Sequence, residues 1–282
     1  KLINVNITGK IVGGLVGRTS GTDYINNSYI MGNINGTQRV GGLVGYSEGL
    51  YVTNSYSTGN VTGTDYVGGL IGHYSAGSQI IKSFSISNVI STGDNAGGLI
   101  GYYQDMDTIS DCYARGNVTG NNNVGGLIGN LAMVTINNCY STGRVTGNTN
   151  LGGLVGYGTD LTITDSYYDN ETSGMSDTGK GVGKTTAEMK NIITFNSTWD
   201  IAYSEDDLND GYPYLGWEND NETTWLIYQT EQAFSGGTGS IADPYMISTP
   251  EQLANMSSNL TAHYKLNNSI DLDVAPYNTG NG

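Results

Sequence analysis

Positively charged side chains are scarce in this chain, where 11 Lys and Arg stand against 26 Asp and Glu and the formal net charge is −15. So few cations leave little to neutralise phosphates or anionic lipids, which argues against nucleic acid and a charged membrane surface as partners. No run of 18 apolar residues occurs either. The sequence therefore predicts no membrane-spanning segment.

Histidine and cysteine are also rare, with two of each, and no Cys-x-x-Cys pair is present. This scarcity excludes a structural zinc site and a dithiol redox motif. Only 13% of the residues are charged while 43 are glycine, a composition that points away from a helical protein. All four prolines and all three tryptophans follow residue 198. This change in composition predicts a domain boundary near residues 168–180.

What the chain does contain is a repeat of 27 to 29 residues. A Gly-Gly-Leu sequence returns six times, and a Ser or Cys followed by an aromatic residue keeps the same spacing. In-phase copies of this kind are typical of a solenoid, in which each repeat forms one coil. The Gly-Gly-Leu copies begin at Gly13, Gly41, Gly68, Gly97, Gly125 and Gly152, and the aromatic residues are Tyr29, Tyr56, Phe84, Tyr113, Tyr140 and Tyr167.

These residues resemble the GLUG-motif repeats, which are named for a Gly-Leu-any-Gly core, here Gly14-Leu15-Val16-Gly17 in the first copy. Such repeats occur in large secreted and cell-surface proteins of bacteria and methanogenic archaea. The resemblance implies an extracellular β-solenoid, although the family as a whole has no single biochemical activity to assign to this chain.

The residues of the repeat favour short strands independently of this resemblance, because stretches such as residues 12–16 and 61–66 are too short for helices and are bounded by turn residues. We therefore expect an all-β protein in which residues 1–168 form a right-handed parallel β-helix of about six coils of 27–29 residues. The coils would stack about 4.8 Å apart. One coil buries little by itself, so stacking on its neighbours must supply the stability. A small mixed α/β region follows.

Two aliphatic columns follow the Gly-Gly pairs. Adjacent strand residues point to opposite faces, so one column would face outward unless the glycines bend the backbone. An outward column would either be covered by another part of the chain or form a stripe for lateral association. The columns are Leu15, Leu43, Leu70, Leu99, Leu127 and Leu154, and Val16, Val44, Ile71, Ile100, Ile128 and Val155.

Cys112 and Cys139 occupy the same position in adjacent repeats, where the other repeats have Ser. Stacked neighbours about 4.8 Å apart fall within the Cα separation that a disulfide tolerates. Two interpretations stay open: a disulfide between coils, and a pair of reduced thiols that fill a small core position.

Asn-x-Ser/Thr sequons are more frequent than the composition alone predicts. They are candidate glycosylation sites, and Asn60 and Asn117 share a column. The alternative is that Asn and Thr serve turns and side-chain ladders. The sequons begin at Asn6, Asn26, Asn35, Asn60, Asn117, Asn170, Asn196, Asn221, Asn255, Asn259 and Asn267.

Residues 169–230, the closing segment, resemble the end of a GLUG block, in which a threonine-led helix precedes Trp and Tyr-Pro-Tyr-Leu. Thr185 with Glu188 three residues later predicts a short capped helix. The bulky aromatic residues of the segment are expected to cover the apolar face of the last coil. Residues 231–282 resemble the leader of a further block, and an inter-subunit segment is the other interpretation. Pro250 after Thr249 predicts a helix start there. We interpret the chain as part of something longer.

Four acidic residues lie near one another in the closing segment: Glu205, Asp206, Asp207 and Asp210. Ca²⁺ takes oxygen ligands from irregular loops, so calcium is the one cofactor for which the sequence offers candidate ligands. Their spacing does not fit an EF-hand, and a solvated acidic loop is the competing interpretation.

No catalytic constellation accompanies the repeats, and we expect a protein that is not an enzyme. The first hypothesis is an extracellular structural protein, a subunit of a cell-surface filament, sheath or layer that assembles with copies of itself. The second is an adhesin for surface glycans or molecules of a host or neighbouring cell, with the tyrosine column stacked on sugar rings. The third is a polysaccharide-active β-helix enzyme, which would need carboxylates clustered with Arg or Lys on one strand face.

The ends of the predicted β-helix suggest how copies would join. Residues 2–8 read as a bare strand, and the exposed edge of a sheet invites pairing with another chain. We expect residues 231–282 of one subunit to pack against the first coil of the next, which gives a head-to-tail polymer that does not close. Flanking blocks of a longer polypeptide are the alternative source of the same contacts.

Overall fold

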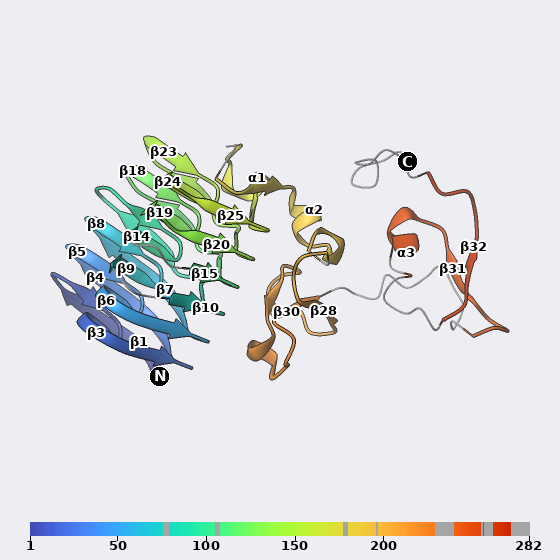
Figure 1. The fold of residues 1–282 in the computed structure, drawn as a ribbon, viewed down its shortest axis with the longest axis horizontal. Helices are drawn as coiled ribbons and strands as arrows, with labels where there is room; N and C mark the ends of the chain where they lie inside the picture. The colour runs from blue at the N-terminus through green and yellow to red at the C-terminus, as the bar shows by residue number, and fades with distance from the viewer. Residues whose placement is uncertain are drawn as a thin grey trace.

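The computed structural model describes residues 1–75, 79–104, 108–176, 180–195, 197–228, 240–254, 256 and 262–271. The predicted parallel β-helix is confirmed: three sheets run along one axis and their strands stack coil upon coil (Figure 1). Each strand pairs in parallel with its counterpart one repeat away, so that Tyr29 lies beside Tyr56 and Gly13 beside Gly41.

The first sheet carries the aromatic residues of the repeat. It starts with β1 (Leu2–Gly9), β4 (Tyr29–Gly36) and β7 (Tyr56–Gly63) and then continues as two rows. One row is β11 (Phe84–Ser85), β16 (Tyr113–Ala114), β21 (Tyr140–Ser141), β26 (Tyr167–Asp169) and β27 (Val182–Lys184); the other is β12 (Asn88–Ser91), β17 (Val118–Thr119) and β22 (Val145–Thr146).

The second sheet starts with β3 (Val16–Asn26) and β6 (Val44–Thr53) and also divides into two rows. These are β9 (Ile71–Ser75), β14 (Ile100–Gln104), β19 (Ile128–Ala132) and β24 (Val155–Thr159), and β10 (Gln79–Ile81), β15 (Thr108–Ser110), β20 (Thr135–Asn137) and β25 (Thr162–Thr164). The third sheet is β2 (Val12–Gly13), β5 (Gln38–Gly41), β8 (Asp65–Gly68), β13 (Ala96–Gly97), β18 (Asn122–Gly125) and β23 (Thr149–Gly152).

The number of turns is larger than the six coils predicted from the Gly-Gly-Leu copies. In the first sheet, β1 pairs with β4 ahead of the first aromatic residue, and β27 pairs with β26 beyond the last one. Neither added strand belongs to a repeat with both motifs, so counting the motifs missed the partial turns at both ends. The row through the aromatic residues has about eight levels: β1, β4, β7, β11, β16, β21, β26 and β27.

The Gly-Gly-Leu sequence forms a corner between the third and second sheets. The backbone N–H groups of Leu43 and Val44 both donate to the carbonyl of Leu70, at 2.8 and 3.1 Å, so the chain turns between these two residues. Both side chains then point into the core and are fully buried. A Cβ on Gly41 would lie 2.0 Å from the carbonyl oxygen of Val44, which explains the glycine. The predicted glycine bend is confirmed, and the alternative of an outward aliphatic stripe for lateral association is wrong.

A second corner precedes each aromatic residue, and its backbone is left-handed, with φ between 44° and 52°. Asn and Asp enter this region more readily than other non-glycine residues, and they fill most of these positions. The strand register places the six residues one above another. We call them the corner column: Asn27, Asn54, Lys82, Asp111, Asn138 and Asp165.

The N-terminal end of the β-helix is open. Strands β1, β2 and β3 each pair on one side only within the sheets. Leu15 and Val16 are only partly buried, although the equivalent Leu43 and Val44 one coil further are fully buried. Val5, Ile7 and Ile25 are likewise partly buried. The first coil therefore presents both unpaired strand edges and half-covered core side chains.

The other end is covered by Tyr168 of the last coil and by the start of the closing segment. The ring of Tyr168 fills the interior against Gly153, where an added Cβ would overlap it. Gly181 lies against Leu154, which is fully buried, and Met175 packs on the core. Leu151 and Ile163 at the margin of this end stay partly buried.

Residues 185–228 of the closing segment run along the flank of the β-helix (Figure 1). The aromatic residues were expected to cover the last coil, and Phe195 and Trp199 do contact Tyr167 of that coil, but they do so from the flank, and other aromatic residues of the segment pack on earlier coils. The elements of the closing segment are α1 (Asn170–Ser173), α2 (Thr186–Met189), the 3₁₀ turns η1 (Ile192–Thr194) and η2 (Gly216–Asn219), and the strands β28 (Ile201–Ser204), β29 (Tyr214–Leu215) and β30 (Trp225–Tyr228).

Both helix starts predicted from the sequence are confirmed. At α2, the Glu188 N–H donates to Thr185 Oγ1 at 3.2 Å and the Thr185 N–H donates to Glu188 Oε2 at 2.8 Å. The helix α3 (Pro250–Ala254) begins after Thr249 and follows β31 (Tyr245–Ile247), which pairs in parallel with β32 (Tyr264–Leu266). Across the described ranges, no helix has the length and apolar character needed to cross a bilayer.

Candidate functional site

The aromatic residues of the repeat form a continuous stack on the outside of the β-helix. Their ring centroids lie 4.6 to 5.1 Å apart from Tyr29 to Tyr140, with interplanar angles of at most 10°. We call this stack the aromatic ladder: Tyr29, Tyr56, Phe84, Tyr113, Tyr140 and Tyr167.

The faces of the ladder rings are occupied by the neighbouring rings. At the N-terminal end of the stack, the Lys1 ammonium lies 5.1 Å from the centroid of Tyr29. Solvent therefore meets ring edges and hydroxyl groups. A sugar that stacks on an aromatic face needs that face free, so the geometry does not favour the predicted use of the tyrosine column as a sugar platform.

The closing segment covers the C-terminal part of the ladder. Tyr113 and Tyr140 are fully buried beneath it, whereas Tyr29 and Tyr56 are only partly buried. Trp225, fully buried, lies 6.1 and 5.9 Å from the centroids of Tyr113 and Tyr140. The covered rings and their cover form a second apolar cluster, separate from the core inside the coils.

Each tryptophan of the closing segment also bonds to the corner column. Trp217 Nε1 donates to the carbonyl of Lys82 at 2.9 Å, and Trp199 Nε1 donates to the carbonyl of Asp165 at 2.9 Å. Trp225 Nε1 donates to Asp111 Oδ1 at 3.2 Å. Indole N–H groups removed from water need an acceptor, and the left-handed corners at Lys82, Asp111 and Asp165 provide one each.

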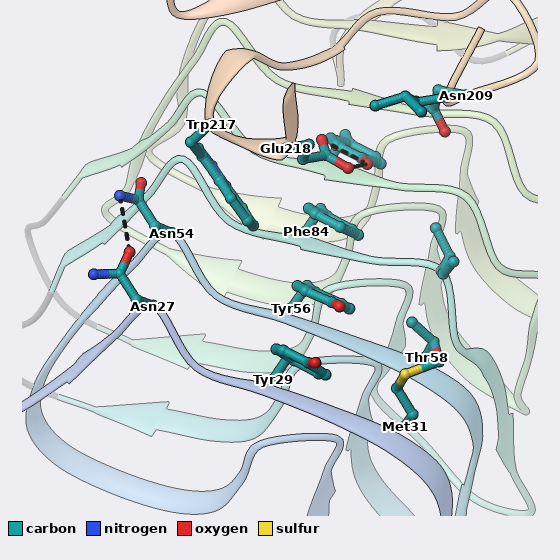
Figure 2. A pocket seen from close by; sticks show the side chains of 13 residues that line it. Asn27, Tyr29, Met31, Asn54, Tyr56, Thr58, Phe84, Asn209, Trp217 and Glu218 are labelled. Atoms are coloured by element: carbon teal, nitrogen blue, oxygen red, sulfur yellow. Dashed lines mark hydrogen bonds between the residues drawn. The ribbon is translucent and has the colours of Figure 1, made fainter. Parts of the chain in front are cut away.

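A groove of about 590 Å³ lies where the cover ends. Figure 2 shows Tyr29, Tyr56 and Phe84 rising one above another along it, with Trp217 beside them and Glu218 at its upper end. Met31 and Leu208, 38% and 53% exposed, add apolar surface to the walls. The groove is thus the uncovered continuation of the interface between the ladder and the closing segment.

Among the residues that line the groove, Glu218 is the one acidic residue. Burial raises the pKa of Glu218 to about 7, although the Leu215 N–H and the Tyr113 hydroxyl donate to its carboxylate and oppose that shift. Burial and the nearby Glu218 charge also raise the pKa of Tyr113. The upper end of the groove therefore changes charge near neutral pH.

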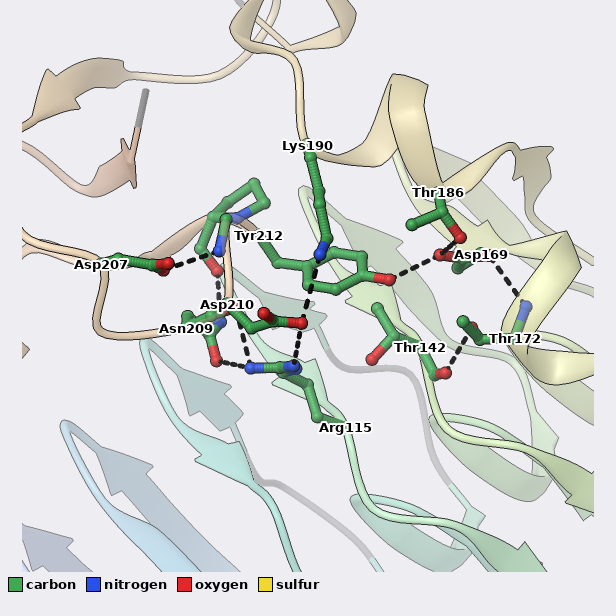
Figure 3. A network of polar contacts seen from close by, with 12 residues as sticks. Arg115, Thr142, Asp169, Thr172, Thr186, Lys190, Asp207, Asn209, Asp210 and Tyr212 are labelled. Carbon is green, nitrogen blue, oxygen red and sulfur yellow. Dashed lines mark hydrogen bonds and ion pairs between the residues drawn. The ribbon is translucent and has the colours of Figure 1, made fainter. Parts of the chain in front are cut away.

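A polar network ties the closing segment to the β-helix beside this groove (Figure 3). Arg115 donates to the backbone carbonyl of Asn209 at 2.8 Å and lies 3.9 Å from Asp210, which also pairs with Lys190 at 3.1 Å. Both cations face the ring of Tyr212, at 4.9 and 4.8 Å from its centroid.

The same network reaches the start of the closing segment. The Tyr212 hydroxyl donates to Asp169 at 2.7 Å, and burial followed by this carboxylate raises the pKa of Tyr212. Asp169 in turn caps α1 by accepting from the backbone N–H of Glu171 and Thr172, each at 3.0 Å. The network holds the segment in register along the ladder.

The four predicted calcium ligands are not brought together. Asp206 accepts from Asn219 at 3.0 Å, Asp207 accepts from the Gly211 N–H at 2.7 Å, and Asp210 belongs to the ion-pair network. Glu205 is exposed. In the part of the chain that the structure describes, no three His, Cys, Asp or Glu side chains converge on a common point. Three of the carboxylates are thus engaged by protein groups: Asp207 within its own loop, and Asp206 and Asp210 by residues outside it.

The sequons fall mostly on exposed positions. Asn6, Asn26, Asn60, Asn117, Asn221 and Asn267 are exposed, Asn35 and Asn170 are partly buried, and Asn196, Asn255 and Asn259 lie outside the described residues. Asn60 and Asn117 share a column as predicted, with Asn88 between them. Asn60 donates to Asn33 at 2.9 Å, so side-chain ladders use the same residues.

Cys112 and Cys139 are both buried free thiols, which fits the second of the two interpretations. Each donates to backbone carbonyls, Cys112 to Ser110 and Cys139 to Asn137, both at 3.1 Å. Burial and the neighbouring Cys139 raise the pKa of the Cys112 thiol.

Sequence reasoning found the ladder but missed the groove. The sequence did offer one signal for the groove: each coil carries one aromatic residue, and a tryptophan-rich segment that could pack on these residues follows the coils. The sequence did not indicate the path of that segment, and this path decides which rings are covered.

Comparison with known protein families places the GLUG motif at residues 36–62 and 94–119. The chain carries GLUG repeats, and the resemblance read from its sequence is confirmed. No curated protein and no solved structure matches the chain.

Proposed function

We propose that this GLUG-motif repeat protein is a non-enzymatic structural protein of the cell surface, which assembles into a filament, sheath or layer through the open end of its β-helix. The GLUG repeats and the exposed sequons support an extracellular location. Assembly is supported by the contrast between the two ends of the solenoid.

The observation that carries the proposal is the first coil. Its strands β1, β2 and β3 keep one unpaired edge each, and Leu15, Val16 and Ile7 lie half-covered inside it. Unpaired edges backed by an apolar interior are the surface on which a further coil stacks. Both hydrogen bonds and apolar burial would be gained by adding one.

The element proposed to dock there is residues 231–282 of the next subunit. The described part of this segment contains the parallel pair β31 and β32, whose register joins Tyr245 to Tyr264 and Ile247 to Leu266. Leu266 is 57% exposed. Placed on the first coil of another copy, these strands continue its sheets and generate an open, head-to-tail polymer.

The test compares the two ends of the β-helix. Ile7→Lys places a charge in the mouth of the open end, and Ile163→Lys places the same charge at a partly buried site in β25 at the other end. Sedimentation velocity and electron microscopy of the full chain should show polymers for the wild type and for Ile163→Lys, and monomers for Ile7→Lys.

A wild type that stays monomeric as its concentration rises would overturn the proposal. So would an Ile7→Lys variant that polymerises as the wild type does. Deletion of residues 231–282 tests the docking element, because polymers that form undiminished without it would eliminate that segment as the donor.

Glycan adhesion is a second candidate function, favoured by a cluster whose residues come from neighbouring strands of the second and third sheets. Arg39 donates to His73 Nδ1 at 3.2 Å and lies 4.6 Å from the centroid of Tyr46. The rings of Tyr66 and Tyr102 flank His73 at 5.2 and 4.8 Å. Burial, and then the Arg39 charge, lowers the pKa of His73 to about 4, so the imidazole is neutral at neutral pH.

Planar rings beside a guanidinium are groups that hold sugars and their carboxylates. A glycan array with the purified chain tests this candidate. Arg39→Ala should abolish a specific signal while Arg144→Ala, at an exposed position, leaves it. Equal signals from both variants would eliminate the cluster as the binding surface.

A further inference from the structure

The three tryptophans of the chain dock on the aromatic ladder in one repeated arrangement. Each indole contacts two consecutive ladder rings and donates its N–H to the corner column beside one of them. Trp199 contacts Tyr140 and Tyr167 at 6.3 and 6.0 Å and bonds to Asp165. Trp217 contacts Tyr56 and Phe84 at 6.2 and 5.8 Å and bonds to Lys82.

Two of these indoles also show how neighbouring tryptophans share one ladder ring. Trp225 contacts Tyr113 and Tyr140, so it shares Tyr140 with Trp199. Their ring centroids lie 4.5 Å apart, which places the two indoles in direct contact. One docked tryptophan therefore forms part of the site for the next.

The groove contains the same set of partners without an indole. Tyr29 and Tyr56 are the next two rings of the ladder, and Trp217 already rests on Tyr56. Asn54 holds the corner position beside Tyr56, with φ of 47° against 48° at Lys82. Among the described residues, none donates a hydrogen bond to the Asn54 carbonyl, whereas the Lys82 carbonyl accepts from Trp217.

We propose that this groove binds a tryptophan-bearing segment of a separate partner protein. The incoming indole lies against Tyr29 and Tyr56, shares Tyr56 with Trp217, and donates its N–H to the Asn54 corner. The groove is continuous with the established contact between the ladder and the closing segment, and the partner extends that contact by one step.

The chain itself has no tryptophan to spare for a second copy. It contains three, and all three are docked on its own ladder. Two are almost completely buried, with exposed fractions of 4% for Trp199 and 0% for Trp225. A polypeptide also fits the groove better than a glycan does, because the ladder presents ring edges beside an unused carbonyl rather than open aromatic faces. This inference is independent of the open end and of polymer formation.

The experiment uses a labelled peptide with the sequence of residues 211–219, which carries Trp217 in its natural context. Binding to the full chain is measured by fluorescence anisotropy, together with the same peptide bearing the change Trp217→Ala. Tyr29 does not contact the chain's own Trp217, so the protein variant Tyr29→Ala separates binding in the groove from exchange with the native segment.

The matched control is Tyr24→Ala. Tyr24 stacks on Tyr51 at 5.2 Å and joins the same two coils at a surface outside the groove. We expect the peptide to bind the wild type and Tyr24→Ala equally, and to lose about fivefold or more in affinity for Tyr29→Ala. The Trp217→Ala peptide should lose binding to all three proteins. If Tyr29→Ala melts earlier than the wild type, Met31→Lys serves in its place, because that side chain is exposed in the groove.

Three results would overturn the proposal. The first is equal affinity of the two peptides, and the second is undiminished affinity for both groove variants. The third is no peptide binding at millimolar concentration while a soluble polysaccharide binds and loses affinity on Tyr29→Ala, which would make the groove a glycan site.

Discussion

The first two coils and the later coils are built from the same repeat but end up in different environments. Leu15 and Leu99 hold the same position of the Gly-Gly-Leu corner, yet Leu15 is partly exposed and Leu99 is fully buried. Tyr29 and Tyr140 hold the same rung of the aromatic ladder, yet only Tyr140 lies beneath the closing segment. The repeat sets where side chains point, the coils on both sides cover the core positions such as Leu99, and the closing segment decides which rings of the ladder are covered.

The largest expected effect comes from placing a charge in the leucine column of the Gly-Gly-Leu corners, once in a later coil and once in the first coil. Leu99→Asp buries an unpaired carboxylate at a position with no compensating group, which costs several kcal/mol, on the order of 5 or more. Thermal unfolding followed by circular dichroism should show loss of the cooperative transition. Leu15→Asp, at the open end, should retain most of the wild-type melting curve. Equal effects of the two substitutions would contradict the difference in environment.

Removing part of the cover is expected to affect the flank and spare the interior. Trp225→Ala deletes a fully buried indole and the bond to Asp111, a loss of about 3–5 kcal/mol from the closing segment. Limited proteolysis should then cut within residues 185–228 while the β-helix keeps its far-ultraviolet signal. Trp217→Ala, at a half-buried indole, should cost less. A Trp225→Ala chain as resistant as the wild type would count against the cover.

The covered half should also respond to pH through Glu218. Its pKa of about 7 in the folded chain lies above the ordinary value of 4.5, so the protonated carboxyl is the form that folding favours. The resulting stabilisation is fully present below pH 4.5 and is lost as the pH rises through about 7, with a total of at most about 3 kcal/mol. The melting temperature of the closing segment should fall between pH 5 and pH 8.

Glu218→Gln supplies the control for that titration, because a neutral amide keeps the shape of the side chain and does not ionise. The variant should melt at the same temperature at pH 5 and pH 8. A wild-type melting temperature without pH dependence in this window would contradict the raised pKa of Glu218, and a variant that keeps the dependence would show that another group is responsible.

The smallest of these effects concerns one glycine column. A Cβ on Gly101 would lie 2.6 Å from the Val67 backbone nitrogen, whereas a Cβ on Gly17 in the first coil would meet only the Ile11 carbonyl oxygen at 3.1 Å. Gly101→Ala should destabilise the chain by roughly 1–3 kcal/mol. Gly17→Ala should change the denaturation midpoint little. Similar midpoints for both variants would mean that the coil below does not restrict this position.

The repeated part of the fold could be predicted from the sequence because the period, the glycine pairs and the aromatic column all specify the same stacking. Gly41 and its counterparts even indicated the bend that turns both aliphatic columns inward. The strand β1 was expected from residues 2–8 but was not counted as a level of the stack, and β27 escaped because its sequence carries neither motif. Their pairing depends on the edge that the neighbouring coil presents.

Only one part of the candidate site, the aromatic ladder, could be predicted from the sequence. The ladder follows from the period of the repeat. The path of residues 185–228 depends instead on single contacts such as that of Trp225 with Asp111, and the repeat pattern does not predict such contacts. The acidic residues were a misleading signal for the same reason. Asp210 pairs with Lys190 and Arg115, and these partners are distant in sequence.

Hydrogen exchange of the assembled and unassembled chain tests the proposed role of the open end most directly. In the separated subunit, the amides of β1 should exchange fast, since one edge of that strand is unpaired, and those of β14 should be protected. In the polymer fraction, residues 2–9 should gain protection while β25 at the other end stays unchanged. Protection of β1 that is the same in both fractions, or that appears at β25 instead, would contradict assembly through the first coil.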